Sequence, residues 1–292
     1  MHLTPTAAFL SAIALSGVSA NASTIVQTVG NQDWNAAVWG SPTATPTPGN
    51  DYKTATGVSS NNVRICAGGT SETFGGGSLE VVYGTTGLLK NQTSTATING
   101  AFTLSGGTLL DGPNGGGSSN YAVTLAVGSF NVTAASTIFI GNAGGNVTIN
   151  KALSGSGDLY FGATNVQTGD VVSFNGISGY TGAITVGAAA PGSLSSGTGA
   201  LTVDFGSADY HFSNLFTILA TSVLNVNSSQ TLTFDAGDLV DPTNGAVPVG
   251  TYTASALGAN YTGSGTIVVV PEPGSLAMLG LTGLLAFRRR RG

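Results

Sequence analysis

Two stretches of the chain decide its fold: Leu153-Ser154-Gly155-Ser156-Gly157-Asp158-Leu159, and Ile177-Ser178-Gly179-Tyr180-Thr181-Gly182-Ala183-Ile184-Thr185-Val186. In each stretch, glycines that can turn the chain are followed by an apolar run of the kind that forms a strand. The two stretches repeat one order of corner and strand. Recurrence of a single unit of this type is typical of strands that coil and stack.

The same pattern extends in both directions from these stretches. Short runs alternate apolar and polar residues, are rich in β-branched and aromatic side chains, and end at Gly, Asn or Ser. No segment of the body sustains a helical period beside charged faces. Clear runs are 78–83, 122–127, 137–140, 146–149, 158–161, 171–174, 183–186, 201–205, 223–226 and 231–234. The sequence therefore predicts an all-β protein.

Composition narrows the choice among all-β folds. Glycine accounts for 45 of 292 residues, and charged residues make up 7% of the chain, against about 25% in an ordinary soluble domain. Stacked solenoid faces tolerate Thr, Ser and Asn ladders, whereas the open edge of a sheet is commonly protected by Lys. We therefore expect a right-handed parallel β-helix, or solenoid, over residues 50–270, with a β-sandwich as the alternative.

The glycine phrases in 153–159 and 177–186 resemble the autotransporter-associated β-strand repeat of passenger-type β-helices. Residues 33–51 resemble the opening cap of proteins of the same exported class, and residues 250–269 resemble their closing strands. Because each rung would bury its apolar residues against its neighbours and could not fold separately, we expect one elongated domain. Residues 23–49 are expected to form an N-terminal cap and a Pro/Thr-rich connector, extended over 41–48 because of its prolines.

The N-terminus has the pattern of a secretory signal peptide over residues 1–22. The apolar run 7–18 precedes Ala20-Asn21-Ala22, whose small residues at Ala20 and Ala22 suit cleavage after Ala22. The segment before this run contains no Lys or Arg, so an ordinary N-terminal core helix is the alternative.

The C-terminus combines three features over residues 271–292: a Pro-Glu-Pro triplet, an apolar run at 276–287 and an arginine cluster. The residues of this signal are Pro271, Glu272, Pro273, Arg288, Arg289, Arg290 and Arg291. In this order they resemble the PEP-CTERM protein-sorting domain of exported bacterial proteins. The resemblance implies that an exosortase cuts near the triplet and passes the body to the outer surface.

The physical properties of this tail agree with a transient membrane anchor. Twelve apolar residues form a helix of about 18 Å, which is shorter than the hydrocarbon core of about 30 Å. The arginines would hold the helix end on the cytoplasmic side of the inner membrane. We therefore expect a short apolar helix that is parked in the inner membrane before processing, with a permanent anchor as the alternative.

Candidate catalytic groups are few. His211 is the single histidine of residues 23–270 and would act as a general base if Asp204 or Asp209 oriented it beside a serine. No Gly-x-Ser-x-Gly elbow marks a nucleophile, and an ordinary strand residue is the alternative. Cys66 is either a reactive thiol or a small residue tolerated at a strand. We expect no enzyme activity.

Metal and nucleic-acid binding receive little support. Asp235, Asp238 and Asp241 are a weak candidate for Ca²⁺, although their spacing matches neither an EF-hand nor a β-roll repeat, and solvated loop acids are the default. No cofactor is expected. Residues 23–270 carry four cations against twelve carboxylates, a net charge of −8, so nucleic acid is excluded as a partner.

Taken together, the chain is predicted to be a non-enzymatic exported protein of the cell surface or extracellular matrix. Its expected partners are signal peptidase and an exosortase during export, the inner membrane transiently, and an extracellular polysaccharide. The alternative is a carbohydrate-binding or carbohydrate-active β-helix. An exposed row of aromatic side chains would favour this alternative, whereas aromatics stacked inside would favour a passive rod; the candidates are Tyr160, Phe161, Tyr180 and Tyr210.

Overall fold

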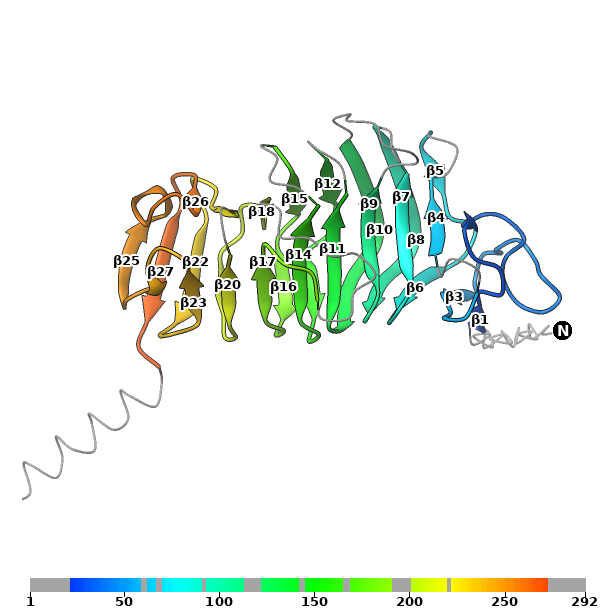
Figure 1. The fold of residues 1–292 in the computed structure, drawn as a ribbon, viewed down its shortest axis with the longest axis horizontal. Coiled ribbons are helices and arrows are strands. Elements are labelled where there is room, and N and C mark those ends of the chain that lie inside the picture. The colour runs from blue at the N-terminus through cyan, green and yellow to red at the C-terminus, as the bar shows by residue number, and fades with distance from the viewer. Residues whose placement is uncertain are drawn as a thin grey trace, which may run out of the picture.

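The computed structural model describes residues 22–58, 62–66, 70–90, 93–112, 122–141, 145–164, 169–190, 201–219 and 222–272. Its strands coil into a solenoid whose turns stack along one axis from the N-terminus to the C-terminus (Figure 1). Each complete turn passes through three faces, as in the succession β12–β13–β14 and then β15–β16–β17. The predicted parallel β-helix is therefore confirmed.

The first face begins with a two-residue strand and includes half of each of the two longest strands. Its members are β5 (Glu72–Thr73), the first halves of β8 (Ser94–Ser105) and β10 (Ala122–Ala134), β12 (Asn146–Ile149), β15 (Val171–Phe174), β18 (Thr202–Asp204), β21 (Val223–Asn225) and β26 (Tyr261–Thr262).

The second face takes the other halves of β8 and β10, because these strands bend through a corner without ending. The others are β1 (Thr24–Val26), β3 (Asp51–Lys53), β6 (Ser78–Val82), β13 (Leu153–Gly155), β16 (Ile177–Tyr180), β19 (Tyr210–Phe212), β22 (Thr231–Asp235), β27 (Thr266–Val270) and β25 (Gly250–Thr253).

The strands β19, β22, β27 and β25 of the second face form a sheet of their own, and the third face is another separate sheet. It comprises β2 (Gln32–Asp33), β4 (Asn62–Ile65), β7 (Thr86–Lys90), β9 (Thr108–Gly112), β11 (Ser136–Ile140), β14 (Leu159–Ala163), β17 (Ile184–Val186), β20 (Phe216–Ile218), β23 (Leu239–Asp241) and β24 (Gly245–Ala246). A single 3₁₀ turn, η2 (Ala254–Ala256), follows β25. Between the named strands of the described residues, pairing is parallel except for β23 with β24 and β25 with β27. A β-sandwich would be antiparallel, so this alternative is wrong.

The length of a turn varies, so the recurring units of the sequence do not follow one fixed period. On the first face, Ala122 pairs with Asn146 and Asn146 with Val171, advances of 24 and 25 residues. The next pair, Val171 with Thr202, advances by 31 residues. The strands keep their register, and the extra residues lie in the connection between β17 and β18. A solenoid tolerates this variation because long surface loops add little entropic cost.

The glycine phrases include positions where neighbouring turns approach each other very closely. A Cβ atom on Gly155 would lie 2.0 Å from the carbonyl oxygen of Val132 in the preceding turn. One on Gly182 would lie 2.1 Å from the carbonyl oxygen of Gly157. These positions require glycine because a side chain cannot fit between backbones that are stacked this closely.

Apolar side chains from all three faces fill the interior. The alternation within β6, β15 and β22 buries every second residue, as expected for strands with one face inward. A column of aromatic rings runs along much of the interior, and stacked pairs within it include Phe102 with Phe130, Phe174 with Phe205 and Phe212 with Phe234. This continuous core holds the turns together, because no single turn could bury its own apolar face.

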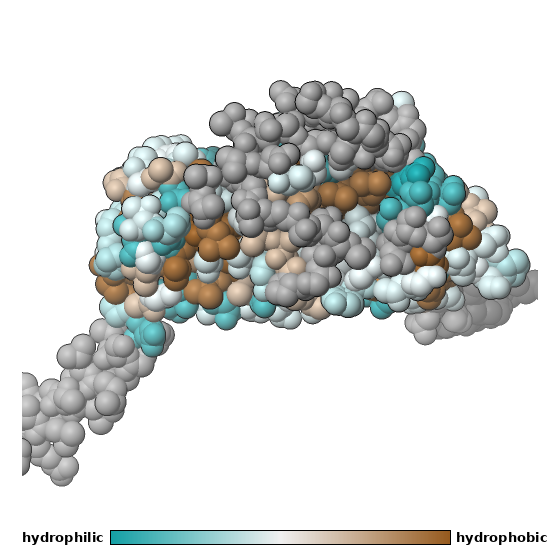
Figure 2. Space-filling model, in the orientation of Figure 1, coloured by the Kyte–Doolittle hydropathy of each residue, from teal (hydrophilic) through white to brown (hydrophobic). Residues whose placement is uncertain are grey.

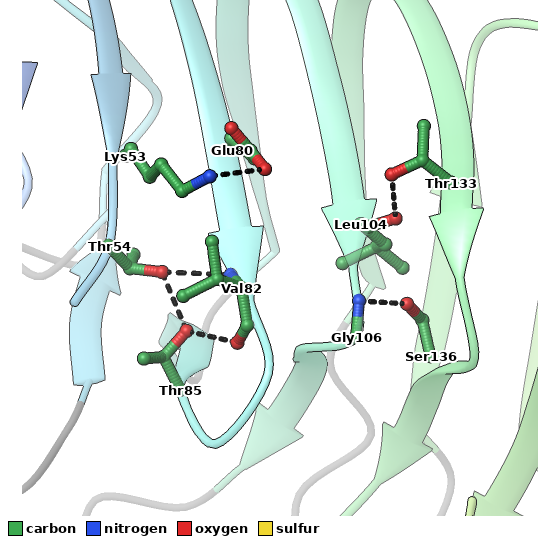
Figure 3. Close-up of polar contacts among 9 residues, drawn as sticks. All are labelled: Lys53, Thr54, Glu80, Val82, Thr85, Leu104, Gly106, Thr133 and Ser136. Carbon is green, nitrogen blue, oxygen red and sulfur yellow. Dashed lines mark hydrogen bonds and ion pairs between the residues drawn. The ribbon is translucent and has the colours of Figure 1, made fainter. Parts of the chain in front are cut away.

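Polar side chains also connect successive turns (Figure 3). The Thr54 and Thr85 hydroxyls lie 2.6 Å apart, and the Val82 amide donates to the Thr54 hydroxyl at 3.0 Å. Further along, the Gly106 amide donates to the Ser136 hydroxyl at 2.9 Å. Both threonine hydroxyls are buried, so these contacts satisfy polar groups that would otherwise be costly in the interior.

The solenoid begins earlier in the chain than the sequence suggested. β1 pairs with β3 and β2 pairs with β4, so turn-to-turn pairing starts at Thr24, within the predicted cap and connector. Trp34 and Trp39 are fully buried at this end, and the Trp34 indole donates to Glu72 at 3.0 Å. The expected extended connector instead turns back, since Ala44 forms a bridge with Trp39.

Candidate functional site

The C-terminal end of the solenoid is the point where the chain leaves its fold. β27 lies between β22 and β25, with a parallel partner on one side and an antiparallel partner on the other. Its Ile267 and Val269 are buried. Pro271 and Glu272 follow directly and are exposed. The Pro-Glu-Pro triplet therefore begins one residue after the last paired residue, Val270, with no linker between them.

An acidic group surrounds the start of this triplet. Val270 is in register with Asp235, whose carboxylate pairs with the His211 ring at 3.1 Å. Burial raises the pKa of Asp238, the neighbouring charges of Asp235 and Glu272 raise it further, and His211 opposes the rise. The negative charge of Glu272 thus acts on Asp238, and the His211 ring, which pairs with Asp235, opposes this effect.

Asp241, the third member of the predicted calcium group, is held by hydrogen bonds within the protein. Its carboxylate accepts hydrogen bonds from the Thr243 and Asn244 amides at 2.7 Å, from the Asn244 side chain at 2.9 Å and from the Tyr261 hydroxyl at 2.7 Å. Burial raises the pKa of Asp241, but these hydrogen bonds outweigh it and leave the pKa below its ordinary value. Within the described ranges, no group of three or more His, Cys, Asp or Glu side chains is arranged to hold a metal ion.

The candidate catalytic histidine pairs with a different carboxylate from the two that the sequence suggested. Asp204 accepts hydrogen bonds from the side chains of Asn225 and Asn227, and Asp209 accepts one from the Thr231 amide. His211 contacts Asp235 instead. Neither of the carboxylates that we expected to orient the ring does so.

Cys66 has the environment of an inert thiol. Its side chain is buried and lies next to Val63 and Ile65, which point inward as the alternation predicts. Burial raises the pKa of the Cys66 thiol to about 11, and nearby carboxylates add to the effect. Because the thiolate is the reactive form, this residue is protected from reaction at neutral pH.

The four candidate aromatics do not form an exposed row. Phe161 and Tyr180 are buried, and the Tyr180 hydroxyl donates to the Gly157 carbonyl at 2.8 Å. Tyr210 is partly buried, and its hydroxyl donates to the Tyr180 carbonyl. Tyr160 is also only partly exposed. This arrangement removes the observation that would have favoured an aromatic glycan-binding strip.

The remaining predicted signals fall largely outside the described residues. These are Ala20 of the signal peptide, Pro273, and the arginine cluster with its apolar run at 276–287. Ala22 is the first described residue and is exposed. Among the residues that the structure does describe, no helix has the length and apolar character needed to span a membrane. The predicted cleavage sites and membrane helix stay predictions.

The last strand of the β-solenoid thus leads directly into a Pro-Glu-Pro tail. Comparison with family models identifies this tail as a PEP-CTERM protein-sorting motif, matched over residues 269–291. No curated protein and no solved structure matches the chain. The motif directs exosortase-dependent sorting to the cell surface. Its first two matched residues, Val269 and Val270, are the last residues of β27, so fold and signal overlap.

Proposed function

We propose that this protein is a non-enzymatic component of the cell surface or extracellular matrix. In this proposal, signal peptidase removes residues 1–22, the tail holds the chain transiently in the inner membrane, and an exosortase releases the body. The observation that carries the proposal is the position of the sorting motif, which begins within the last two residues of the last described strand, β27. Removal of the tail would leave every described strand in place.

An extracellular polysaccharide is the partner that the surface suits best. One outward column on the first face consists of Thr95, Thr124, Thr148, Ser173, Asp204, Asn225 and Thr262, each in register with the next. Successive strands lie about 4.8 Å apart, so the column presents regularly spaced hydroxyl, amide and carboxylate groups. The face seen in Figure 2 carries many weakly polar residues around scattered hydrophobic patches. Such a surface would contact sugar hydroxyls through many weak hydrogen bonds.

Sorting is tested in the native host with the full-length chain and the variant Glu272→Gln. Mass spectrometry of the surface, medium and membrane fractions should find wild-type protein that starts near Ser23 and lacks the arginine cluster. The variant should accumulate uncut in the membrane fraction. Glu80→Gln on β6 is a matched control, because it makes the same change far from the tail and disrupts only a surface ion pair. Uncut wild-type protein in the soluble cell fraction would refute the sorting proposal.

The polysaccharide contact is tested separately on the processed protein recovered from the surface or medium. Pull-down with the host's own extracellular polysaccharide should give saturable binding that weakens in Thr148→Val, which removes one exposed hydroxyl from the column. Thr251→Val on β25, also exposed, is the matched control. Equal binding by both variants, or no binding by the wild type, would contradict a role for this column.

A further inference from the structure

A carboxyl side chain lies among aliphatic residues inside the solenoid. Asp111 on β9 is in register with Leu89 on β7 and with Ile140 on β11, so it occupies an inward column of the third face. Leu89 and Ile140 are completely buried, and Asp111 is only 1% exposed. An aliphatic residue would fit this position, and a carboxylate there must be compensated by something.

No hydrogen-bond donor among the described side chains compensates it. Both Asp111 carboxyl oxygens are buried without a hydrogen-bond partner. The two ion pairs of these ranges are Lys53 with Glu80 and His211 with Asp235, and the Arg64 guanidinium donates to Asn31. A buried polar group without a partner costs roughly 1–3 kcal/mol, and more if it is charged.

A second buried carboxylate shares this corner of the coil. Asp170, directly before β15, is 2% exposed, and its Oδ1 accepts a hydrogen bond from the Gly145 amide at 3.1 Å. Gly145 immediately precedes β12, and the Gly141 amide that follows β11 donates to the Asp111 carbonyl oxygen. Both acids thus contact backbone amides at the corner between the third and first faces. Burial raises the pKa of Asp111 to about 7, and the charge of Asp170 contributes to the rise.

We propose that Asp111 and Asp170 bind a calcium ion inside this corner of the solenoid. The chemistry fits because calcium takes oxygen ligands in flexible geometry, and the unpartnered Asp111 oxygens can bind it as a bidentate pair. A divalent cation neutralises two carboxylates in a place where water cannot solvate them. Sites of extracellular modules commonly bind calcium at about 10⁻⁴–10⁻³ M, and we expect this range.

The proposal is tested on the full-length chain after treatment with a chelator. Isothermal titration with Ca²⁺ should give one ion per chain, and the thermal unfolding midpoint should rise by several degrees at saturating calcium. Asp111→Leu should fold, because leucine continues the column of Leu89 and Ile140, and should lose both responses. Asp235→Asn should keep both, because Asp235 belongs to the acidic group at the far end of the coil.

Two results would overturn the proposal. One is a wild-type protein that shows neither calcium binding nor a calcium-dependent midpoint. The other is an Asp111→Leu protein that binds calcium as the wild type does. If Asp111→Leu does not fold, Asp170→Asn takes its place, because the amide oxygen can still accept the Gly145 hydrogen bond. Undiminished binding by that variant is likewise a refutation, and a loss of binding supports the site.

Discussion

The most direct test of the stacked geometry is the variant Gly155→Ala. Gly155 has a φ of +107°, and its Cβ would lie 2.0 Å from the carbonyl oxygen of Val132, the residue with which it pairs in the preceding turn. Real Cβ atoms essentially never approach within 3.0 Å of another heavy atom. The added methyl group therefore has to push two turns apart by about 1 Å.

A second glycine separates this clash from backbone strain. Gly176 has almost the same φ, +108°, but the nearest atom to its added Cβ is the Ala208 Cβ at 3.9 Å. Unfavourable φ costs about 1–2 kcal/mol for a residue with a Cβ, and this cost applies to both variants. Overpacking adds typically about 1–3 kcal/mol, and it applies to Gly155→Ala alone.

We therefore expect Gly176→Ala to lower the free energy of unfolding by about 1–2 kcal/mol and Gly155→Ala to lower it by about 2–5 kcal/mol. Urea titration of the full-length chain, followed by far-UV circular dichroism, measures both values. Equal losses in the two variants would refute the close approach of β13 to β10, since φ strain alone would then explain both.

Three further predictions concern the aromatic core, the C-terminal tail and the loss of stability at acidic pH. Phe205 is fully buried against four other aromatic rings. Phe205→Ala should therefore lower the free energy of unfolding by about 3–5 kcal/mol, and Phe205→Leu should lower it clearly less. Equal urea midpoints for these variants and the wild type would contradict the aromatic column. A chain ending at Val270 should keep the unfolding midpoint of the full chain. A chain that also lacks β27 should lose about 1.5–3 kcal/mol of unfolding free energy for each of the two buried side chains of β27. Equal midpoints for the two truncations would show that β27 adds nothing to stability. The pKa of Asp241 is lowered in the folded state. Its contribution to stability is therefore complete above pH about 4 and disappears as the pH falls through the folded-state pKa. Asp241→Asn should flatten this part of the pH–stability curve, and an unchanged curve would contradict a stabilising role of the Asp241 carboxylate.

Local pattern was enough to predict the class of fold. Alternation within each short run places one face inward whatever the later course of the chain, so the buried residues of β6, β15 and β22 follow from the sequence. The glycine phrases were also informative, because a position where an added Cβ would lie 2.0 Å from a neighbouring carbonyl oxygen has to be glycine. What the pattern could not supply is the length of each turn, since loop residues add to a turn without changing strand register.

The acidic group shows where proximity in the sequence misleads. Asp235 and Asp241 are six residues apart, but the corner between β22 and β23 separates them, so one ends a strand of the second face and the other ends a strand of the third. The partner of Asp241 is Tyr261, which comes from a later turn. Asp111 did leave a signal: alternation places it on the same face as Leu109, which is buried. That signal conflicts with the usual exposure of aspartate, and such conflicts often mark functional positions.

Asp111 and Asp241 occupy equivalent positions, and comparison of the two strengthens the case for a bound ion. Each follows an inward-facing leucine by two residues on a strand of the third face, and each is almost completely buried. The protein surrounds the Asp241 carboxylate with four hydrogen-bond donors, whereas the Asp111 carboxyl oxygens receive none. The fold can thus satisfy an inward aspartate with its own groups where it has to. At Asp111 it supplies a second carboxylate in place of donors, and a pair of acids is stabilised by a cation.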